Sequence, residues 1–168
     1  MRIISVIVLC GYAFFSCKPA HLEKKKIVYI NSYHVGHPSS DEIMDAVLGY
    51  FPEDSFDVKS FLMDTKRNPS IDHIQKTADA LYDSLQEIQP DILIVSDDNA
   101  VKYIVQPHVD ELGIPVVFCG VNGSDKEYNL PPERVTGMLE ILPLKQTLAA
   151  LMPYFPDARR LLVLSENT

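Results

Sequence analysis

Short apolar runs alternate with longer stretches in which apolar residues recur every three or four positions along most of this 168-residue chain. The runs are rich in β-branched residues and are typical of strands that are buried on both faces of a sheet. They cover residues 26–30, 56–63, 92–95, 115–119, 135–138 and 160–164. The pattern therefore predicts six strands.

The stretches between these runs have the periodicity of helices. Predicted helices span residues 40–51, 71–88, 99–106 and 143–152. The third should stop before Pro107, because proline lacks an N–H for the helix ladder, although a further turn as far as Leu112 is left open. A regular alternation of strands and helices predicts an α/β fold: a doubly wound parallel sheet with right-handed crossovers, forming a Rossmann-like lobe.

The N-terminus follows a different pattern. Met1 and Arg2 carry positive charge, residues 3–15 are almost wholly apolar, and a polar stretch follows Ser16 and Cys17. This order predicts a secretory signal peptide over residues 1–16. The apolar run is shorter than the roughly 20 residues of a transmembrane helix, and an uncleaved N-terminal anchor helix is the alternative.

Residues 14–17 read Phe-Phe-Ser-Cys and resemble a bacterial lipobox, although the two Phe residues depart from its usual first positions. We therefore expect Cys17 to be acylated and residues 17–26 to form a lipid anchor and tether. The protein would then be exported, periplasmic or at the cell surface, and held at a membrane. Cys10 would leave with the signal, so Cys119 would have no disulfide partner and is expected to be a buried apolar residue.

The charge balance argues against one class of partner. The chain is 46% hydrophobic and 23% charged, with a formal net charge of −8, and its only basic stretch is residues 24–26. Nucleic acid is therefore not an expected partner.

Polar residues follow the predicted strands where each strand ends. The carboxyl ends of parallel strands meet at one edge of the sheet, where ligands bind in open α/β folds. The candidate ligand-binding residues are Asn31, Ser32, Tyr33, His34, Asp64, Lys66, Ser96, Asp97, Asp98, Asn99, Gly120, Val121, Asn122 and Glu140. Turn and helix-cap chemistry is the alternative for any single cluster. Carboxylates in such a cleft favour a ligand with an ammonium group or several hydroxyls, such as an amino acid, an amine, a nucleoside or a sugar.

Motifs for catalysis and for cofactors do not occur in the sequence. It contains no G-x-G-x-x-G, no G-x-x-x-x-G-K-[ST] and no G-x-S-x-G motif. His34, His37 and Asp41 have the spacing of one helix face, but Gly36 and Pro38 interrupt the helix that a metal site there would need. We therefore expect no enzyme activity, no metal and no cofactor.

Several longer runs carry a family resemblance. INSYHVGHPSSDEI, MDTKRNPS, PDILIVSDDNAVKYIV, IPVVFCGVN and VTGMLEILPLKQTL resemble ABC-transporter substrate-binding proteins with the periplasmic-binding protein type I fold. Closely similar segments occur in the extracellular sensing domains of bacterial histidine kinases. The runs SDDNA and FCGVN are the most specific of these.

The resemblance implies two lobes that are joined by a hinge and close on a small-molecule ligand. Residues 27–142 match the N-terminal ligand-binding lobe, and residues 143–168 match the first helix and strand of a second lobe that is incomplete here. It implies that the protein captures a small polar molecule and delivers it to the permease of an ABC importer. The alternative is the ligand-sensing domain of a histidine-kinase-type receptor.

Overall fold

A computed structural model describes residues 23–122 and 125–164 of the chain. The predicted signal peptide over residues 1–16 and the predicted lipid attachment at Cys17 lie outside the described residues. In the part of the chain that the structure describes, no helix is long and apolar enough to cross a membrane.

Five strands form one parallel sheet in the order β2-β1-β3-β4-β5. The strands are β1 (Lys25–Asn31), β2 (Phe56–Leu62), β3 (Ile92–Ser96), β4 (Val116–Val121) and β5 (Val135–Leu139). The predicted α/β class and parallel sheet are confirmed. The chain moves outward from β1 to β2 and then returns past β1 to β3, so the direction of winding reverses between β1 and β3. Ligands bind at such a switch point in open α/β sheets.

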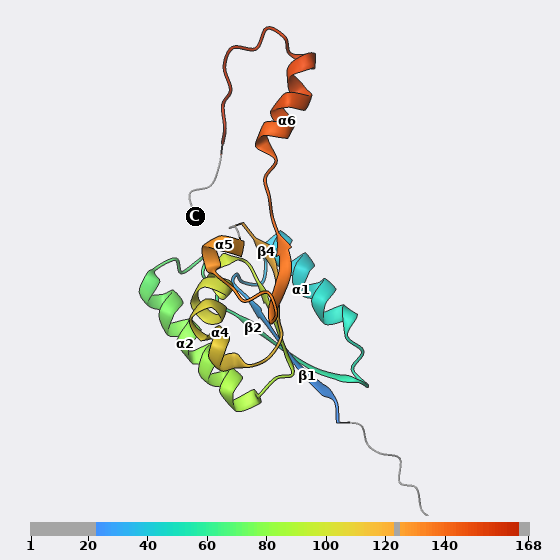
Figure 1. Cartoon of the computed structure of the whole chain (residues 1–168), viewed down its shortest axis with the longest axis vertical. Coiled ribbons are helices and arrows are strands. Elements are labelled where there is room, and N and C mark those ends of the chain that lie inside the picture. The colour runs from blue at the N-terminus through green and yellow to red at the C-terminus, as the bar shows by residue number, and fades with distance from the viewer. Residues whose placement is uncertain (1–22, 123–124, 165–168) are drawn as a thin grey trace, which may run out of the picture.

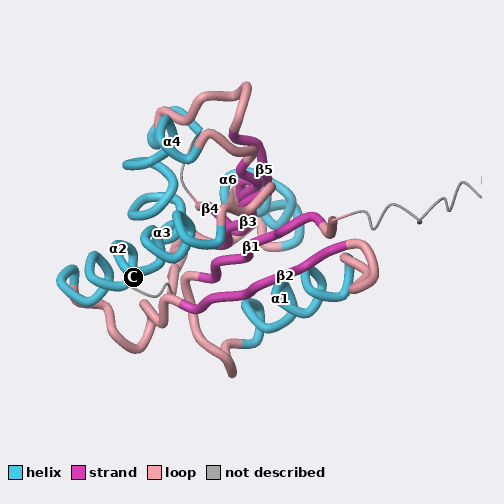
Figure 2. Tube along the Cα trace, turned by 90° about the horizontal axis from the view of Figure 1, so that it is seen from below, coloured by secondary structure: helices cyan, strands magenta, loops and turns pink. Residues whose placement is uncertain are grey.

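Helices cover both faces of the sheet (Figures 1 and 2). They are α1 (Pro38–Tyr50), α2 (Ile71–Ile88), α3 (Asp98–Ala100), the π-helical turn η1 (Val101–Val105), α4 (Gln106–Leu112), α5 (Asp125–Tyr128), α6 (Leu144–Leu151) and the 3-10 turn η2 (Met152–Tyr154). Helix α1 lies on one face, whereas α2 and α4 lie on the other. The predicted bounds of α2 are confirmed, because its apolar stripe is long and regular.

The main core lies between the sheet and α2, η1 and α4. Strand residues such as Val28, Leu93 and Val95 are fully buried there against α2 residues such as Ala78 and Leu85. The opposite face is covered unevenly. Ile27 and Tyr29 on β1 are fully buried, whereas Val117 on β4 is 38% exposed. The β1–β3 region is therefore the best-packed part of the sheet.

The sequence predicted that the helix after β3 stops before Pro107 and left open a further turn as far as Leu112. The structure has the longer helix. Segments α3, η1 and α4 follow one another without a break as far as Leu112. Gln106 N donates to Val101 O in the wider π spacing, and Pro107 occupies the first turn of α4. A widened turn and a first-turn position both tolerate the missing N–H of proline.

The predicted tether over residues 17–26 extends too far into the fold. Strand β1 begins at Lys25, and Lys26 N donates to Asp91 Oδ2 at 2.8 Å. The Lys25 ammonium pairs with the other oxygen of Asp91 at 2.8 Å. These charged residues join the strand because Asp91, which precedes β3, supplies their partners.

The strand predicted over residues 160–164 is not formed. The chain leaves β5 and carries α6 away from the sheet as an arm (Figure 1). Leu162 and Leu164 on this arm are 81% and 86% exposed. An apolar run needs neighbouring strands to complete its hydrogen bonds, and the arm lies apart from the sheet.

Candidate functional site

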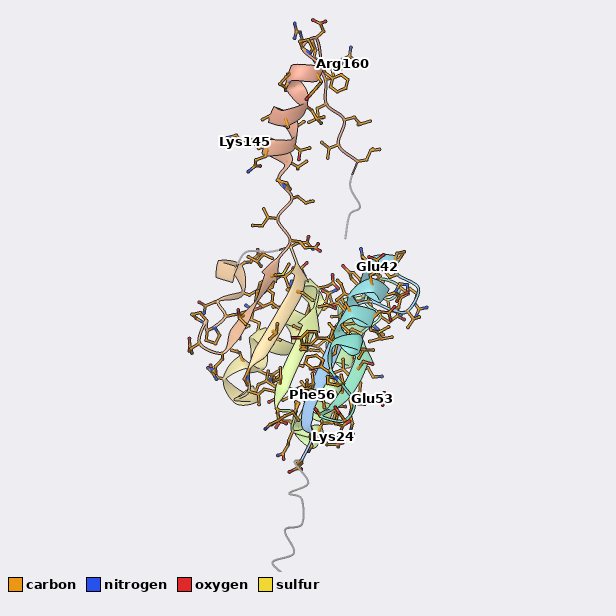
Figure 3. All side chains as sticks on the ribbon, turned by 90° about the vertical axis from the view of Figure 1, so that its right-hand side faces the viewer. Lys24, Glu42, Glu53, Phe56, Lys145 and Arg160 are labelled. Carbon is orange, nitrogen blue, oxygen red and sulfur yellow. The ribbon has the colours of Figure 1, made fainter. Side chains whose placement is uncertain are left out.

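The carboxyl ends of the five strands lie at the end of the lobe from which the α6 arm emerges. In Figure 3, Lys24, Glu53 and Phe56 mark the opposite end of the sheet, and Lys145 lies on the arm. The candidate residues therefore share one edge, as their positions after the strands predicted. Their environments within that edge differ greatly.

Ser32 forms hydrogen bonds that join the loops after β1, β2 and β3 at the switch point. Its Oγ donates to Ser96 O at 2.7 Å and accepts from Ala100 N at 2.9 Å, so it caps the helix that starts at α3. Its carbonyl accepts from both N and Oγ1 of Thr65, at 3.0 and 2.8 Å. Asn99 Nδ2 then donates to Thr65 Oγ1 at 2.9 Å. Ser32 and Ser96 are fully buried, so their side chains hold the edge together.

Thr65 is a residue of this network that the sequence analysis missed. It is 3% exposed and lies between two residues that were selected, Asp64 and Lys66. The signal that could have identified Thr65 was its position in the polar loop after β2. Its burial depends on contacts with Ser32 and Asn99, more than thirty residues away on either side.

Asn31 connects the end of β1 to the start of α1. Its Nδ2 donates to Ser40 Oγ at 2.6 Å, and its Oδ1 accepts from Tyr33 N at 2.9 Å. Asn31 is fully buried and Ser40 is 2% exposed. This side chain therefore orients the loop that carries Tyr33.

Asp64 is bound by its own loop. Arg67 Nε and Nη2 donate to its two carboxylate oxygens at 2.7 and 2.8 Å, and Asn68 Nδ2 donates at 3.0 Å. His34 Nδ1 lies 3.5 Å from Asp64 Oδ1. The Arg67 guanidinium lowers the pKa of Asp64, which therefore stays charged. The Asp64 carboxylate is already well satisfied without a ligand.

Asp98 joins three elements. Asn122 donates to it from both N and Nδ2, at 3.2 and 3.0 Å to the nearer oxygens. Tyr128 OH donates to Asp98 Oδ1 at 2.6 Å. Tyr128 was not selected from the sequence, since it lies in a loop-like stretch that the pattern did not place at this edge. Asp98 thus binds the end of β4 and helix α5 to α3.

Asp97, the preceding residue, has the opposite environment. It is 8% exposed, and among the described residues no group forms a hydrogen bond with its Oδ2 atom. Its backbone has φ 68° and ψ 167°, a region that costs a non-glycine residue about 1–3 kcal/mol. Strain of this kind persists where the surrounding structure holds a side chain in a required position.

The pKa of Asp97 is raised to about 7. Burial is the main cause, and the negative charges of Glu140 and Asp98 add to it. The neighbouring hydroxyl groups of Tyr33 and Ser96 act in the opposite direction, but they do not offset the effect of burial on this pKa. Asp97 is therefore an acid that is half-ionised near neutral pH.

Gly120 makes room for this carboxyl group. Its φ is +68°, and a Cβ atom there would lie 3.2 Å from Asp97 Oδ1. Asp97 N also donates to Cys119 O at 2.9 Å. The end of β4 is therefore shaped around Asp97.

Tyr33 and Glu140 flank Asp97. Burial and the charges of Asp97 and Asp98 raise the pKa of Tyr33, so its phenol stays protonated. Lys66 Nζ lies 5.3 Å from the centre of the Tyr33 ring, and the His37 ring packs against it at 4.7 Å. Glu140 is exposed, and its backbone N donates to Val121 O at 2.7 Å.

The structure thus places most of the predicted residues in two groups. Asp97, Tyr33, Gly120 and Glu140 come together around one buried carboxyl oxygen that is open only in the sense that no described group forms a hydrogen bond with it. The side chains of Asn31, Ser32, Asp64, Ser96, Asp98, Asn99 and Asn122 are engaged with neighbouring protein groups. Val121 is 1% exposed, and its side chain belongs to the core.

Neither a scan against protein-family models nor a search of curated proteins finds a match for this chain. The fold is similar to the ligand-free, open structure of a substrate binding protein with adhesive properties from Clostridium difficile. The TM-score is 0.54 at 14% sequence identity. The match covers 80% of this chain and 45% of that one, so this chain spans less than half of its structural neighbour. The lobe therefore has the fold of a substrate-binding protein.

Proposed function

We propose that this chain belongs to an extracytoplasmic solute-binding lipoprotein that captures a small polar molecule for an ABC importer. The observation that carries the proposal is the buried Asp97 carboxyl, which has an open oxygen at the switch point of the sheet. A buried polar atom without a partner is costly and requires a reason. A ligand that binds at this edge supplies the missing partner.

The fold supports the same proposal. Its likeness to a ligand-free, open substrate binding protein suggests a lobe that forms one wall of a cleft. We propose that residues 143–168 begin a second lobe and that this lobe covers the carboxyl edge when ligand binds. The protein then binds and releases its ligand unchanged, without catalysis.

A thermal-shift screen tests the binding role. The exported protein is screened against amino acids, amines, nucleosides and sugars, at concentrations well above micromolar. A ligand at 100 times its Kd adds about 2.7 kcal/mol to the free energy of unfolding, which is an upward Tm shift of several degrees. A panel in which no compound raises Tm contradicts the proposal.

Two variants place the binding site. Asp97→Asn should abolish the shift produced by a compound found in the screen. Asp57→Asn removes the same charge from an exposed position on β2 and should keep the shift. Equal ligand-induced Tm shifts in both variants would show that the ligand does not bind at Asp97.

The lipid anchor has a separate test. Expression of the full chain in a bacterial host with a radiolabelled fatty acid should label the wild-type protein and leave a Cys17→Ser variant unlabelled. Unlabelled wild-type protein would favour the histidine-kinase-type sensing domain, which is held by its own membrane spans.

A further inference from the structure

The open carboxyl oxygen of Asp97 restricts the chemistry of the ligand. Oδ2 is buried in a residue that is 92% enclosed, and it accepts from no described group. An acceptor in this situation takes a proton, a hydroxyl donor or a cationic donor. Once the carboxyl group is ionised, the surrounding charges discriminate between the two kinds of donor.

The carboxyl groups around the site leave an excess of negative charge. Glu140 and Asp98 are the charged groups that raise the pKa of Asp97. The hydrogen bonds that Asp98 accepts come from neutral donors, the amides of Asn122 and the phenol of Tyr128. The Arg67 guanidinium is engaged with both oxygens of Asp64. Negative potential therefore persists at Asp97, and a cationic donor gains more there than a neutral hydroxyl.

The geometry also indicates which side of the site the cation occupies. Lys66 already lies over the Tyr33 ring, at 5.3 Å from its centre. A second cation on that ring face would be repelled by the Lys66 ammonium. A cation is therefore expected on the side of the Asp97 and Glu140 carboxyl groups, whose negative charges act on each other.

Resting on the proposed binding function, we infer that the ligand carries a protonated amine, whose ammonium group donates to Asp97 Oδ2 between Tyr33 and Glu140. The strained backbone of Asp97 and the absence of a Cβ at Gly120 hold the carboxyl group in place for this contact. An ammonium group has three donors, so it can bind Asp97 and Glu140 at once. Anionic ligands and ligands whose only donors are hydroxyls are disfavoured.

This contact couples binding to pH. An ammonium group pairs with the ionised carboxylate, so affinity should be highest between about pH 8 and the pKa of the ligand's amine, and should fall about tenfold for each unit below pH 7. The groups that face Asp97 are Tyr29 and Tyr33 from the β1 side, Cys119 from β4, Asp98 from α3 and Glu140 after β5. The phenols of Tyr29 and Tyr33 have raised pKa values, as does the Cys119 thiol, so these three groups stay protonated in this range.

Matched pairs of compounds test the inference by calorimetric titration of the exported protein at pH 8. Each pair differs only in an amine and a hydroxyl: putrescine with 1,4-butanediol, phenethylamine with 2-phenylethanol, and L-phenylalanine with L-3-phenyllactate. We expect binding of the amine member of at least one pair, with at least 100-fold weaker binding of its hydroxyl partner. A hydroxyl compound, a sugar or a nucleoside that binds as tightly as any amine would overturn the inference while leaving the binding function intact. A titration in which no compound of any class binds contradicts both.

Variants of the site complete the test on the amine that binds. Asp97→Asn should weaken it about 100-fold, and Glu140→Gln by a smaller factor of about 3–10. Asp57→Asn, an exposed charge change on β2, should leave affinity unchanged. Circular dichroism shows whether each variant is folded. Unchanged affinity in folded Asp97→Asn, or affinity that does not fall between pH 7 and pH 5, would overturn the inference.

Discussion

Two adjacent aspartates at the end of β3 differ in what surrounds them. Asp98 accepts from Asn122 and Tyr128, so its carboxylate is satisfied by the fold. Asp97 has a buried oxygen without a partner and a backbone in a region that disfavours side chains. One of the pair stabilises the lobe, whereas the other reduces its stability and is the residue that we propose binds the ligand.

The cost of the Asp97 charge should be visible in the pH dependence of stability. Its pKa in the folded protein, about 7, is above the ordinary value of 3.8. Between these pH values the folded protein retains a proton that the unfolded chain releases. The contribution of Asp97 to the free energy of unfolding is therefore fully present below about pH 4 and is lost as pH rises through 7.

Asp97→Asn should remove this dependence. We expect the variant to be more stable than the wild type by a few kcal/mol, on the order of 4, at pH 8, and equally stable near pH 4. Urea denaturation at both pH values measures the difference. Asp98→Asn serves as the contrast, because it weakens satisfied hydrogen bonds and should destabilise the protein at pH 8. If Asp97→Asn is less stable than the wild type at pH 8, the buried Asp97 charge does not reduce stability as expected.

Gly120→Ala should disturb the same carboxyl group. The new Cβ would lie 3.2 Å from Asp97 Oδ1 on a residue with φ +68°. We expect a loss of about 1–2 kcal/mol in the free energy of unfolding, together with weaker ligand binding. Gly49→Ala in α1 is the control, since its Cβ meets nothing within 4 Å, and should be neutral or stabilising by up to about 1 kcal/mol. Equal effects of the two changes would show that Gly120 has no special role.

At the scale of elements, the helix that follows β3 is capped by a side chain from the loop after β1. Its first residues receive no cap from their own side chains. Ser32, more than sixty residues earlier, accepts from Ala100 N instead. The sequence located the strand and the start of the helix, but it offered helix-cap chemistry only within each local cluster. Local pattern carries no information about which distant side chain lies next to a helix end.

Ser32→Ala should therefore weaken the whole switch point. The change leaves Ala100 N without its acceptor and removes the donor to Ser96 O, both in fully buried positions. We expect a loss of about 2–3 kcal/mol by urea denaturation. Ser84→Ala is the control, because Ser84 Oγ is exposed on α2 and donates to Ala80 O of its own helix. That change should alter stability by less than about 0.5 kcal/mol.

At the scale of the whole molecule, the sheet lobe and the α6 arm are distinct in packing. Leu148, Leu151, Met152 and Phe155 line a hollow within the arm itself. In the described part of the arm beyond residue 142, every side chain except that of Leu148 is exposed. Little of the lobe's burial therefore depends on the arm.

Ending the chain after residue 142 should leave the lobe folded. We expect its free energy of unfolding to change by less than about 1 kcal/mol, because the arm adds little buried surface to the sheet. Ending the chain after residue 134 also removes β5, with its buried Val135, and should cost several kcal/mol. Urea denaturation of the two shortened proteins separates these outcomes. A large loss on the first truncation would show that the arm stabilises the lobe.

Much of this architecture followed from local pattern alone. The five strands of the sheet and the bounds of α2 were predictable because a buried parallel strand and an amphipathic helix have strong periodic signals. The run at residues 160–164 has the same apolar signal but is not a strand, since a strand exists only where a neighbour completes its hydrogen bonds. The composition of residues 160–164 does not show whether a neighbouring strand is present.

The sequence by itself determined the α/β class and the edge of the sheet at which polar side chains gather. Both follow from periodicity and from the rule that parallel strands end together. Only the tertiary structure decided which of those side chains are engaged and which are open. Asp97 and Asp98 are indistinguishable neighbours in the sequence, but the partners of Asp98 come from β4 and α5, 24 and 30 residues away. Hydrogen-bond satisfaction depends on such distant contacts, so the open carboxyl at Asp97 becomes apparent only when the chain is folded.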